Sequence, residues 1–246
     1  DVCSSDLPSD FNELNINPEN PKDENRDRFV LSKGHAAPVL YSALARRGFF
    51  DPKELMTLRK IGSDLQGHPN MNDLPGIDMS TGSLGQGISA AVGMALAGKV
   101  DKKDYRVYAL LGDGELEEGQ VWEASMCAAH YNLDNLTIFI DFNGLQIDGD
   151  ITKVMSPCPI DKKFEAFGWN VLVIDGHNYD EILGAIEKAK NHKGEPTAII
   201  CNTVKGKGVS FMENEASWHG TAPSKEQCEV AVKDWCADRC GNRRKS

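Results

Sequence analysis

The chain has 246 residues, of which 40% are hydrophobic, 7% aromatic and 26% charged. This is the composition of an ordinary globular protein, and it excludes a disordered, collagen-like or low-complexity chain. The 27 Lys and Arg against 37 Asp and Glu give a net charge of −10, which argues against binding to the phosphate backbone of nucleic acids. The longest apolar stretch, Ile88 to Ala97, is shorter than the ~20 residues that span a bilayer, so no membrane partner is expected. Seven scattered cysteines without a Cys-x-x-Cys pair favour reduced thiols and a cytoplasmic location.

The two ends of the chain do not have the pattern of folded elements. Residues 1–10 lack an apolar period, and their first seven, DVCSSDL, resemble a translated sequencing adapter. We interpret residues 1–10 as an artefact or, alternatively, as a native disordered leader. Residues 236–246 are expected to form a solvated basic tail. A single domain is therefore predicted at residues 11–235.

Periodic apolar residues predict helices in the first half of the chain and alternating strands and helices after Tyr105. The first helices are expected at Ala36–Arg47, Lys53–Ile61 and Leu84–Ala97. Strands are expected at Arg106–Leu111, Leu136–Asp141, Asn170–Asp175 and Pro196–Thr203, with helices at Glu118–Tyr131 and Asn178–Asn191. Apolar strands separated by helices predict an α/β fold, a doubly wound and mostly parallel sheet with helices on both faces.

Polar residues follow two of these strands at their carboxyl ends, which is where such sheets bind ligands. The first strand ends in GDGELEEG, in which Gly112 and Gly114 let the backbone beside Asp113 approach a bulky anion. The helix that begins near Glu118 offers its free N–H groups to a phosphate. Because a carboxylate repels a phosphate unless a cation lies between them, Asp113 predicts a Mg²⁺ site.

The next strand supplies a second metal ligand. Asn143 follows it, thirty residues after Asp113, with a neutral amide oxygen, and the turn at Gly144 and Leu145 offers a carbonyl. A Gly-Asp-Gly sequence by itself is ordinary loop chemistry. The combination with an asparagine at the end of the adjacent strand is what favours a metal and diphosphate site.

This spacing resembles the thiamine diphosphate signature, and longer motifs make the resemblance more specific. They are DRFVLSKGHAAPVLYSALARRG at 27–48, GHPN at 67–70, TGSLGQGISAAVGMALA at 81–97 and WHGTAP at 218–223. From about Phe11 to about Trp235 the chain resembles the N-terminal, diphosphate-binding half of transketolase, in the form encoded as a separate short subunit. The resemblance implies the thiamine-diphosphate-binding fold.

The resemblance also implies cofactors and site residues. Thiamine diphosphate with Mg²⁺ or Ca²⁺ is expected, and the implied metal ligands are Asp113, Asn143 and the Leu145 carbonyl. His35, His68, His219 and Glu118 are the implied catalytic residues; His68 would reach the donor sugar, and Glu118 would lie at an interface between paired active sites. The expected cofactor-binding residues are His35, His68, Gly82, Leu84, Gly112, Asp113, Gly114, Glu115, Asn143 and His219.

The implied activity is that of transketolase in the pentose phosphate pathway, the transfer of a two-carbon glycolaldehyde unit from a ketose phosphate to an aldose phosphate. The family's second half completes the cofactor site, so we expect a complementary C-terminal subunit, a heterotetramer, and an open apolar wall around Leu84 and the Ile88 helix. An upstream Gly-His motif of the family has no match here, which implies a truncated, helical N-terminal part. The alternatives are another thiamine diphosphate enzyme, such as 1-deoxyxylulose-5-phosphate synthase or a dehydrogenase component, and a non-catalytic cofactor-binding subunit; GHPN favours transketolase.

Overall fold

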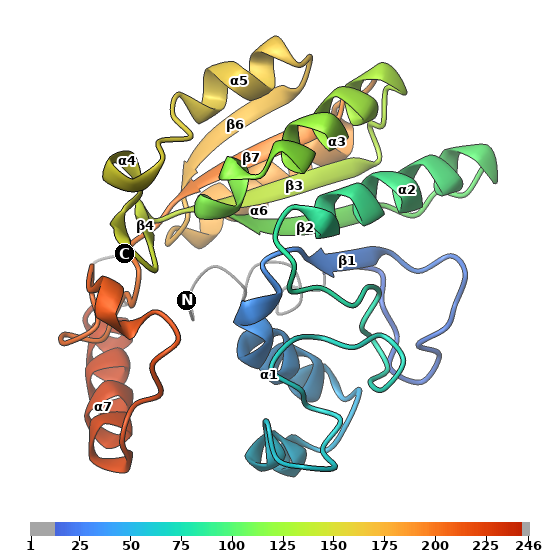
Figure 1. The fold of residues 1–246 in the computed structure, drawn as a ribbon. Coiled ribbons are helices and arrows are strands. Elements are labelled where there is room, and N and C mark those ends of the chain that lie inside the picture. Colours follow the sequence, from blue (N-terminus) through green and yellow to red (C-terminus); the bar gives the residue numbers. More distant parts are fainter. Residues whose placement is uncertain (1–12, 243–246) are drawn as a thin grey trace.

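A five-stranded parallel sheet forms the centre of the molecule (Figure 1). The structure is a computed structural model that describes residues 13–242, so the expectations for residues 1–10 and for the last residues of the basic tail lie outside it. The strand order is β1 (Arg28–Leu31), β2 (Val107–Gly112), β3 (Leu136–Phe142), β7 (Thr197–Asn202) and β6 (Asn170–Asp175). Each neighbouring pair is parallel. The predicted α/β architecture is therefore confirmed.

Helices cover both faces of the sheet, as predicted for a doubly wound fold (Figure 1). Side chains of successive residues in β2 alternate between two apolar clusters because a strand points them to opposite faces. Tyr108 and Leu110 pack on the face covered by α1 (Ala37–Arg47) and α6 (Tyr179–Asn191). Ala109 and Leu111 pack on the opposite face, which is covered by α2 (Gln86–Val100), α3 (Gly119–His130) and α5 (Ile160–Ala166).

Several elements differ from the expectations. Helix α5 and the last helix, Lys225–Asn242, were not predicted. Strand β1 is absent from the predicted list; it has four residues at the edge of the sheet, too few to show a period. The expected helix at Lys53–Ile61 is instead the shorter 3₁₀ helix η2 (Pro52–Thr57), which Asp51 caps by accepting a hydrogen bond from the Lys53 N–H at 2.9 Å. It ends at its C-cap Leu58, whose ψ of 125° is not helical, and Arg59 follows with a left-handed φ of 60° at the start of a series of turns.

Short elements surround the carboxyl ends of the strands. The 3₁₀ helix η1 (Gly34–Ala36) follows β1, and η3 (Gly114–Glu117) follows β2. After β3 come the two-stranded hairpin β4 (Leu145–Gln146) and β5 (Gly149–Asp150) and the single turn α4 (Ile151–Val154). The segment after β7 carries η4 (Ala216–Trp218) before the last helix, α7 (Lys225–Asn242).

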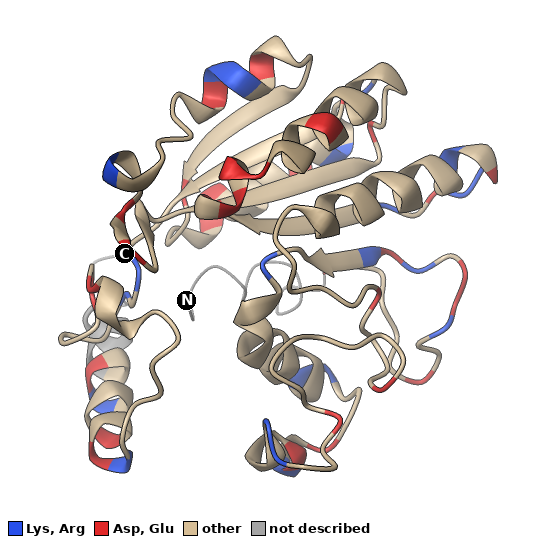
Figure 2. Ribbon diagram, viewed as in Figure 1, with Lys and Arg blue, Asp and Glu red and all other residues tan. Residues whose placement is uncertain are grey.

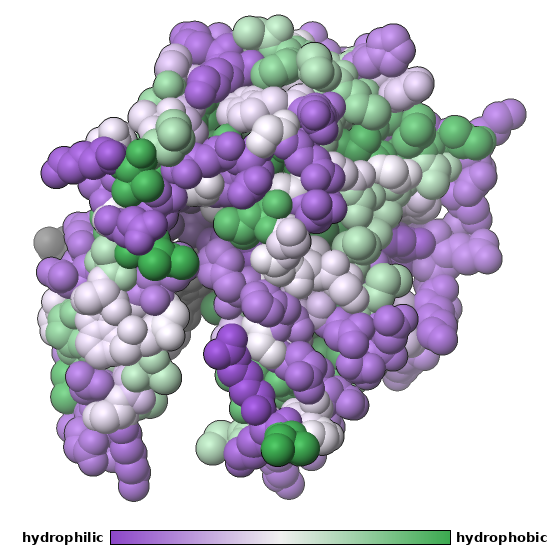
Figure 3. All heavy atoms as spheres, viewed as in Figure 1, coloured by the Kyte–Doolittle hydropathy of each residue, from purple (hydrophilic) through white to green (hydrophobic). Residues whose placement is uncertain are grey.

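Helix α7 stands apart from the sheet and leaves a hollow on the face shown in Figure 3, between α7 and the part of the chain that contains α1 and η2 (Figures 1 and 3). Its residues up to Cys236 are mostly exposed, and the helix continues past the boundary predicted at residue 235. Basic and acidic residues are interspersed on the surface elements of Figure 2. Across residues 13–242 no helix has the length and apolarity that a membrane crossing requires.

Candidate functional site at the carboxyl ends of the strands

The parallel pairing of β2 and β3 brings the two predicted side-chain metal ligands together. Asp113 follows β2, and its Oδ2 accepts a hydrogen bond from the N–H of Gly144, in the turn after β3, at 2.6 Å. Its Oδ1 accepts one from the N–H of Gly114 at 2.8 Å. Asn143 Oδ1 accepts from the N–H of Leu145 at 3.0 Å, so the amide and the turn that carries the third expected ligand form one rigid unit.

The carboxylate of Asp113 is buried, with an exposed fraction of 2%. Burial, together with the negative charge of Asp141, raises its pKa to about 6 in spite of the hydrogen bonds from Gly144 and Gly114, which act in the opposite direction. A buried carboxylate whose charge is poorly compensated is a natural ligand for a cation. Among the described residues no three His, Cys, Asp or Glu side chains are grouped to hold a metal. A cation at this place would instead have a carboxylate, an amide and a carbonyl as ligands, which are hard oxygen donors of the kind that Mg²⁺ and Ca²⁺ prefer.

Asp141, at the end of β3, connects the metal turn to two other segments. The Lys33 ammonium lies 2.5 Å from its Oδ2, the Thr203 hydroxyl donates to its Oδ1, and the Asn143 amide nitrogen donates to Oδ2 at 3.3 Å. Burial by itself would raise the pKa of Asp141, but Lys33 and the hydrogen bonds hold it well below its ordinary value. Because the amide nitrogen of Asn143 donates to Asp141, its amide oxygen points toward the turn at Gly144 and Leu145.

Three expected histidines meet near this edge. The rings of His35, in η1, and His219, after η4, have centroids 5.2 Å apart. The ring of His68 lies against the backbone of Gly82, where a Cβ would come within 2.7 Å of His68 Cδ2. The fold thus brings together residues as far apart in the sequence as His35 and His219, which are separated by more than 180 residues. The histidines predicted from the glycine-flanked motifs lie near one another.

Two of these histidines, His35 and His219, have lowered pKa values and are therefore neutral near pH 7. Partial desolvation lowers the pKa of His35 to about 4, although the residue keeps exposed surface, and the nearby charge of Lys33 acts in the same direction. The pKa of His219 is also lowered, first by burial and then by Lys205 and Lys33. The Nδ1 atom of His219 is buried without a hydrogen-bond partner among the described residues. A ligand that accepts or donates a hydrogen bond there would relieve the cost of burying that atom.

Two buried lysines at this site were not predicted. Lys33 and Lys205 have exposed fractions of 2% and 7%, and burial together with the charge of Lys33 lowers the pKa of Lys205. Each lies beside glycine in a motif visible in the sequence, SKGH at 32–35 and KGKG at 205–208. Their burial beside Asp141 and the histidines depends on the fold, since lysine is rarely buried and a sequence pattern marks it as exposed.

The assembled groups fit a diphosphate with a divalent cation. The charges of Lys33 and Lys205 make the electrostatic environment of the two neutral histidines positive, which favours an anion. The Asp113–Asn143 pair could provide oxygen ligands for a cation, and the buried Nδ1 of His219, which has no partner within the described part of the chain, could provide a polar atom for the anion. The fit rests on these groups, which come from five separate segments of the chain.

The remaining expected residues lie on the adjacent loop and helix starts. Gly82 has a φ of +143°, and Leu84 is half-buried just before Gly85, the residue that caps α2. Glu118 is exposed and caps α3. Glu115 points inward, with an exposed fraction of 2%.

The open apolar wall expected around Leu84 and the Ile88 helix does not include the Ile88 side chain itself, which the periodicity of the helix places on its buried face. The Ile88 side chain is wholly buried, because this side of α2 packs on the sheet together with Val92 and the strand residues of the same cluster. Leu84 is the one residue of the two that retains exposed surface.

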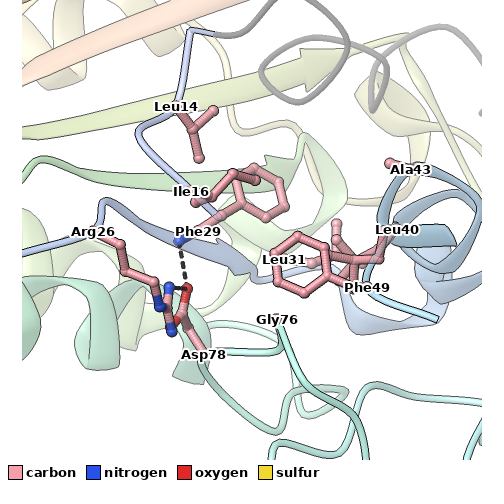
Figure 4. A pocket seen from close by; sticks show the side chains of 11 residues that line it. Leu14, Ile16, Arg26, Phe29, Leu31, Leu40, Ala43, Phe49, Gly76 and Asp78 are labelled. Atoms are coloured by element: carbon pink, nitrogen blue, oxygen red, sulfur yellow. Dashed lines mark hydrogen bonds and ion pairs between the residues drawn. The ribbon is translucent and has the colours of Figure 1, made fainter. Parts of the chain in front are cut away.

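A separate apolar pocket lies between the start of the described chain, β1 and α1 (Figure 4). Leu14, Ile16, Phe29 and Phe49 line it, and the Arg26–Asp78 ion pair lies at one side. Asp78 also accepts a hydrogen bond from the N–H of Phe29 at 2.8 Å. None of the expected site residues lines this pocket, so it is distinct from the strand-end site.

Residues 10–239 match the family model described as the transketolase, thiamine diphosphate binding domain. The chain is 48% identical over 224 residues to the 6-deoxy-6-sulfo-D-fructose transketolase subunit SqwG of Clostridium sp. (strain MSTE9), covering 91% of this chain and 82% of the relative. It is 44% identical to one of the named subunits of the apulose-4-phosphate transketolase of Phocaeicola vulgatus, covering 91% and 79%. Human transketolase is 46% identical over 226 residues, but the match spans 36% of that longer protein.

A solved structure shows the same fold. The transketolase of Pichia stipitis in complex with sedoheptulose 7-phosphate superposes with a TM-score of 0.87 at 33% identity, covering 94% of this chain and 36% of the other. The family match over nearly the whole length and this structural similarity agree on the family of the chain. It belongs to the family of transketolase thiamine diphosphate-binding domains.

Proposed function

We propose that the chain is the diphosphate-binding subunit of a transketolase, which transfers a two-carbon glycolaldehyde unit from a ketose phosphate to an aldose phosphate. The observation that carries the proposal is the convergence of Asp113 and Asn143 with His35, His219 and Lys205 at one edge of the sheet. That arrangement pairs oxygen ligands for a cation with a positive site for a diphosphate. The family of the chain is consistent with this use of the site.

The metal ligands in this proposal are Asp113, Asn143 and the carbonyl of Leu145. When bound, thiamine diphosphate supplies the electron sink that allows the C2–C3 bond of a ketose to break. Lys205, His35 and His219 bind the diphosphate; Lys33 holds Asp141 and, through it, the orientation of Asn143. Because the pKa values of His35 and His219 are lowered, both rings are neutral near pH 7 and can either donate a hydrogen bond or accept a proton.

His68 is proposed to contact the donor sugar, and Gly82 and Leu84 to line the pocket beside the rings of the cofactor. The close approach of the His68 ring to Gly82 supports this assignment, because a side chain at position 82 would displace the ring. Glu118, exposed at the start of α3, is proposed to lie at a subunit interface. A cytoplasmic location and a place in the pentose phosphate pathway stay predictions.

A complementary C-terminal transketolase subunit is proposed to complete the site, with two copies of each chain in a heterotetramer. Two relatives that match most of their own length are named as subunits, whereas human transketolase carries a much longer chain. The names of these two relatives specify different sugars, 6-deoxy-6-sulfo-D-fructose and apulose 4-phosphate. Sugar phosphates are the proposed substrates here, and the sugar itself is to be found by assay.

A binding measurement on Asp113→Asn tests the proposed site. Thiamine diphosphate is titrated by calorimetry into the chain mixed with its complementary subunit, with Mg²⁺ and again with EDTA. We expect binding of the parent to require the cation, and the substitution to weaken it at least about tenfold, because the ligand loses its charge. Asp148→Asn, in the exposed turn of the β4–β5 hairpin, is the control and should leave the affinity unchanged. Equal affinities for the parent and Asp113→Asn would remove the metal assignment.

A further inference from the structure

Glu115 is buried between three segments of the proposed site. It lies in η3, two residues after Asp113, and its exposed fraction is 2%. Oε1 accepts hydrogen bonds from the Ser32 hydroxyl and from the N–H of Gly85 at 2.8 Å. Oε2 accepts from the N–H of Gly112 at 3.2 Å. We call these four residues the Glu115 bridge.

Each donor in the bridge belongs to a segment that carries an expected cofactor contact. Ser32 precedes Lys33 and His35, Gly85 follows Gly82 and Leu84, and Gly112 precedes Asp113. These segments are separated by 27 residues or more in the chain, and a buried carboxylate is costly unless donors satisfy it, so the bridge selects one relative placement of all three. Both oxygens of Glu115 accept hydrogen bonds from protein donors, two at Oε1 and one at Oε2.

Close backbone contacts show how little freedom this placement has. A Cβ on Gly34 would lie 2.6 Å from the nitrogen of Gly82, so the segment with His35 and the loop with Leu84 touch directly. A Cβ on Gly87 would lie 2.5 Å from the hydroxyl oxygen of Ser32. The hydroxyl of Thr81 also donates to the carbonyl of Leu31 at 2.7 Å. A small shift of one segment therefore displaces the others.

We propose that Glu115 is a positioning residue for cofactor binding: through Ser32, Gly85 and Gly112 it sets the His35 segment and the Leu84 loop relative to the metal-binding turn at Asp113. It acts through these donors and does not itself touch the cofactor. The role rests on the proposed function, because it is the thiamine diphosphate site that the three segments form. This role explains why Glu115 is buried and hydrogen-bonded to three segments, which a direct contact with the cofactor would not explain.

Glu115→Gln and Glu117→Gln make a matched pair, since both replace a carboxylate by an amide in the same 3₁₀ helix, one buried and one exposed. The first measurement is amide hydrogen exchange of the cofactor-free chain, followed over residues 29–36 and 81–88. Loss of one buried hydrogen bond to a charged acceptor is worth about a tenfold change in opening. We expect Glu115→Gln to speed exchange at Gly85 and in both segments about tenfold, and Glu117→Gln to leave them within about twofold.

The second measurement is the affinity for thiamine diphosphate with Mg²⁺ and the complementary subunit. Glu115→Gln is expected to weaken binding about tenfold, and Ser32→Ala, which removes one donor and retains the acid, about threefold. The double variant should be weakened by less than the product of the two effects, because both act on one interaction. Ser32→Ala also keeps the test open if Glu115→Gln does not fold.

The outcomes are distinguishable. Affinities of Glu115→Gln and Ser32→Ala equal to that of Glu117→Gln would overturn the positioning role, and faster exchange with unchanged affinity would show that the bridge serves stability only. If the parent itself does not bind thiamine diphosphate, the proposed function fails. In that case exchange in Glu115→Gln that matches Glu117→Gln would overturn the bridge as well, while faster exchange in both segments would support it as the device that aligns them.

Discussion

His68 and His219 come from distant motifs, and the structure gives them different surroundings. His68 is exposed and packs against Gly82, on the loop that leads into α2. His219 is half-buried beside His35, and its buried Nδ1 has no hydrogen-bond partner within residues 13–242. We therefore expect two different kinetic effects. His219→Ala should raise the apparent dissociation constant of the cofactor by about tenfold, the value of a hydrogen bond to a charged group. His68→Ala should chiefly lower kcat or raise the KM of the ketose.

Steady-state kinetics at varied cofactor and varied ketose, with the complementary subunit present, separates the two effects. His130→Ala, at the exposed end of α3, is the control and should resemble the parent. Identical effects of His68→Ala and His219→Ala on the same constant would show that at least one role is misassigned.

The lowered pKa of His35 has a consequence for stability. Its ordinary value is 6.5 and its folded value is about 4, so between these pH values the unfolded chain takes up a proton that the folded chain does not. The contribution of His35 to stability is thus fully present above about 6.5 and is lost as the pH falls toward 4. His35→Gln should flatten the fall in the free energy of unfolding over this interval, and His130→Gln should not. Urea denaturation of the cofactor-free chain at several pH values checks this; parallel curves for parent and His35→Gln would contradict it.

At the scale of the elements, the strands β3 and β6 differ in what their side chains bury. Ile138, in the middle of β3, is wholly buried, whereas Val173, on the edge strand β6, has an exposed fraction of 56%. Ile138→Ala should therefore reduce the free energy of unfolding by about 2–5 kcal/mol, through lost burial and a cavity. Val173→Ala should change it by less than about 0.5 kcal/mol. Similar losses in urea denaturation of the two variants would mean that β6 is covered by a part of the molecule that the described fold does not include.

The elements with a clear period were predictable, and the site was predictable only in part. Strands β2, β3, β6 and β7 begin and end within two residues of the expected positions, because short continuous apolar runs define them. Strand β1 and the inward turn of Glu115 were not predictable, since the first is too short for a period and the second depends on donors from three segments. The burial of Lys33 was not predictable for the same reason, since it depends on a long-range contact with Asp141.

At the scale of the whole molecule, the proposed site lies at one edge of the sheet, next to the hollow between α7 and the part that contains α1 (Figures 1 and 3). Helix α7 contributes few buried residues to the fold, and the described exposed apolar side chains on it include Val230 and Val232. Exposed apolar surface beside a ligand site is typical of a surface that another chain covers. This agrees with the proposal that a complementary subunit closes the site and excludes water from it.

The most direct test of the account is a ketol-transfer assay on each of the two chains by itself, this one and its complementary subunit, and on the mixture of both, at saturating thiamine diphosphate and Mg²⁺. Light scattering on the same samples gives the mass of each assembly. We predict no transfer by either chain alone, transfer by the mixture, and a mass for the active species equal to two copies of each chain. Turnover by a homo-oligomer of this chain would contradict the split-subunit account, and a mixture that assembles and binds cofactor without turnover would identify a non-catalytic cofactor-binding subunit.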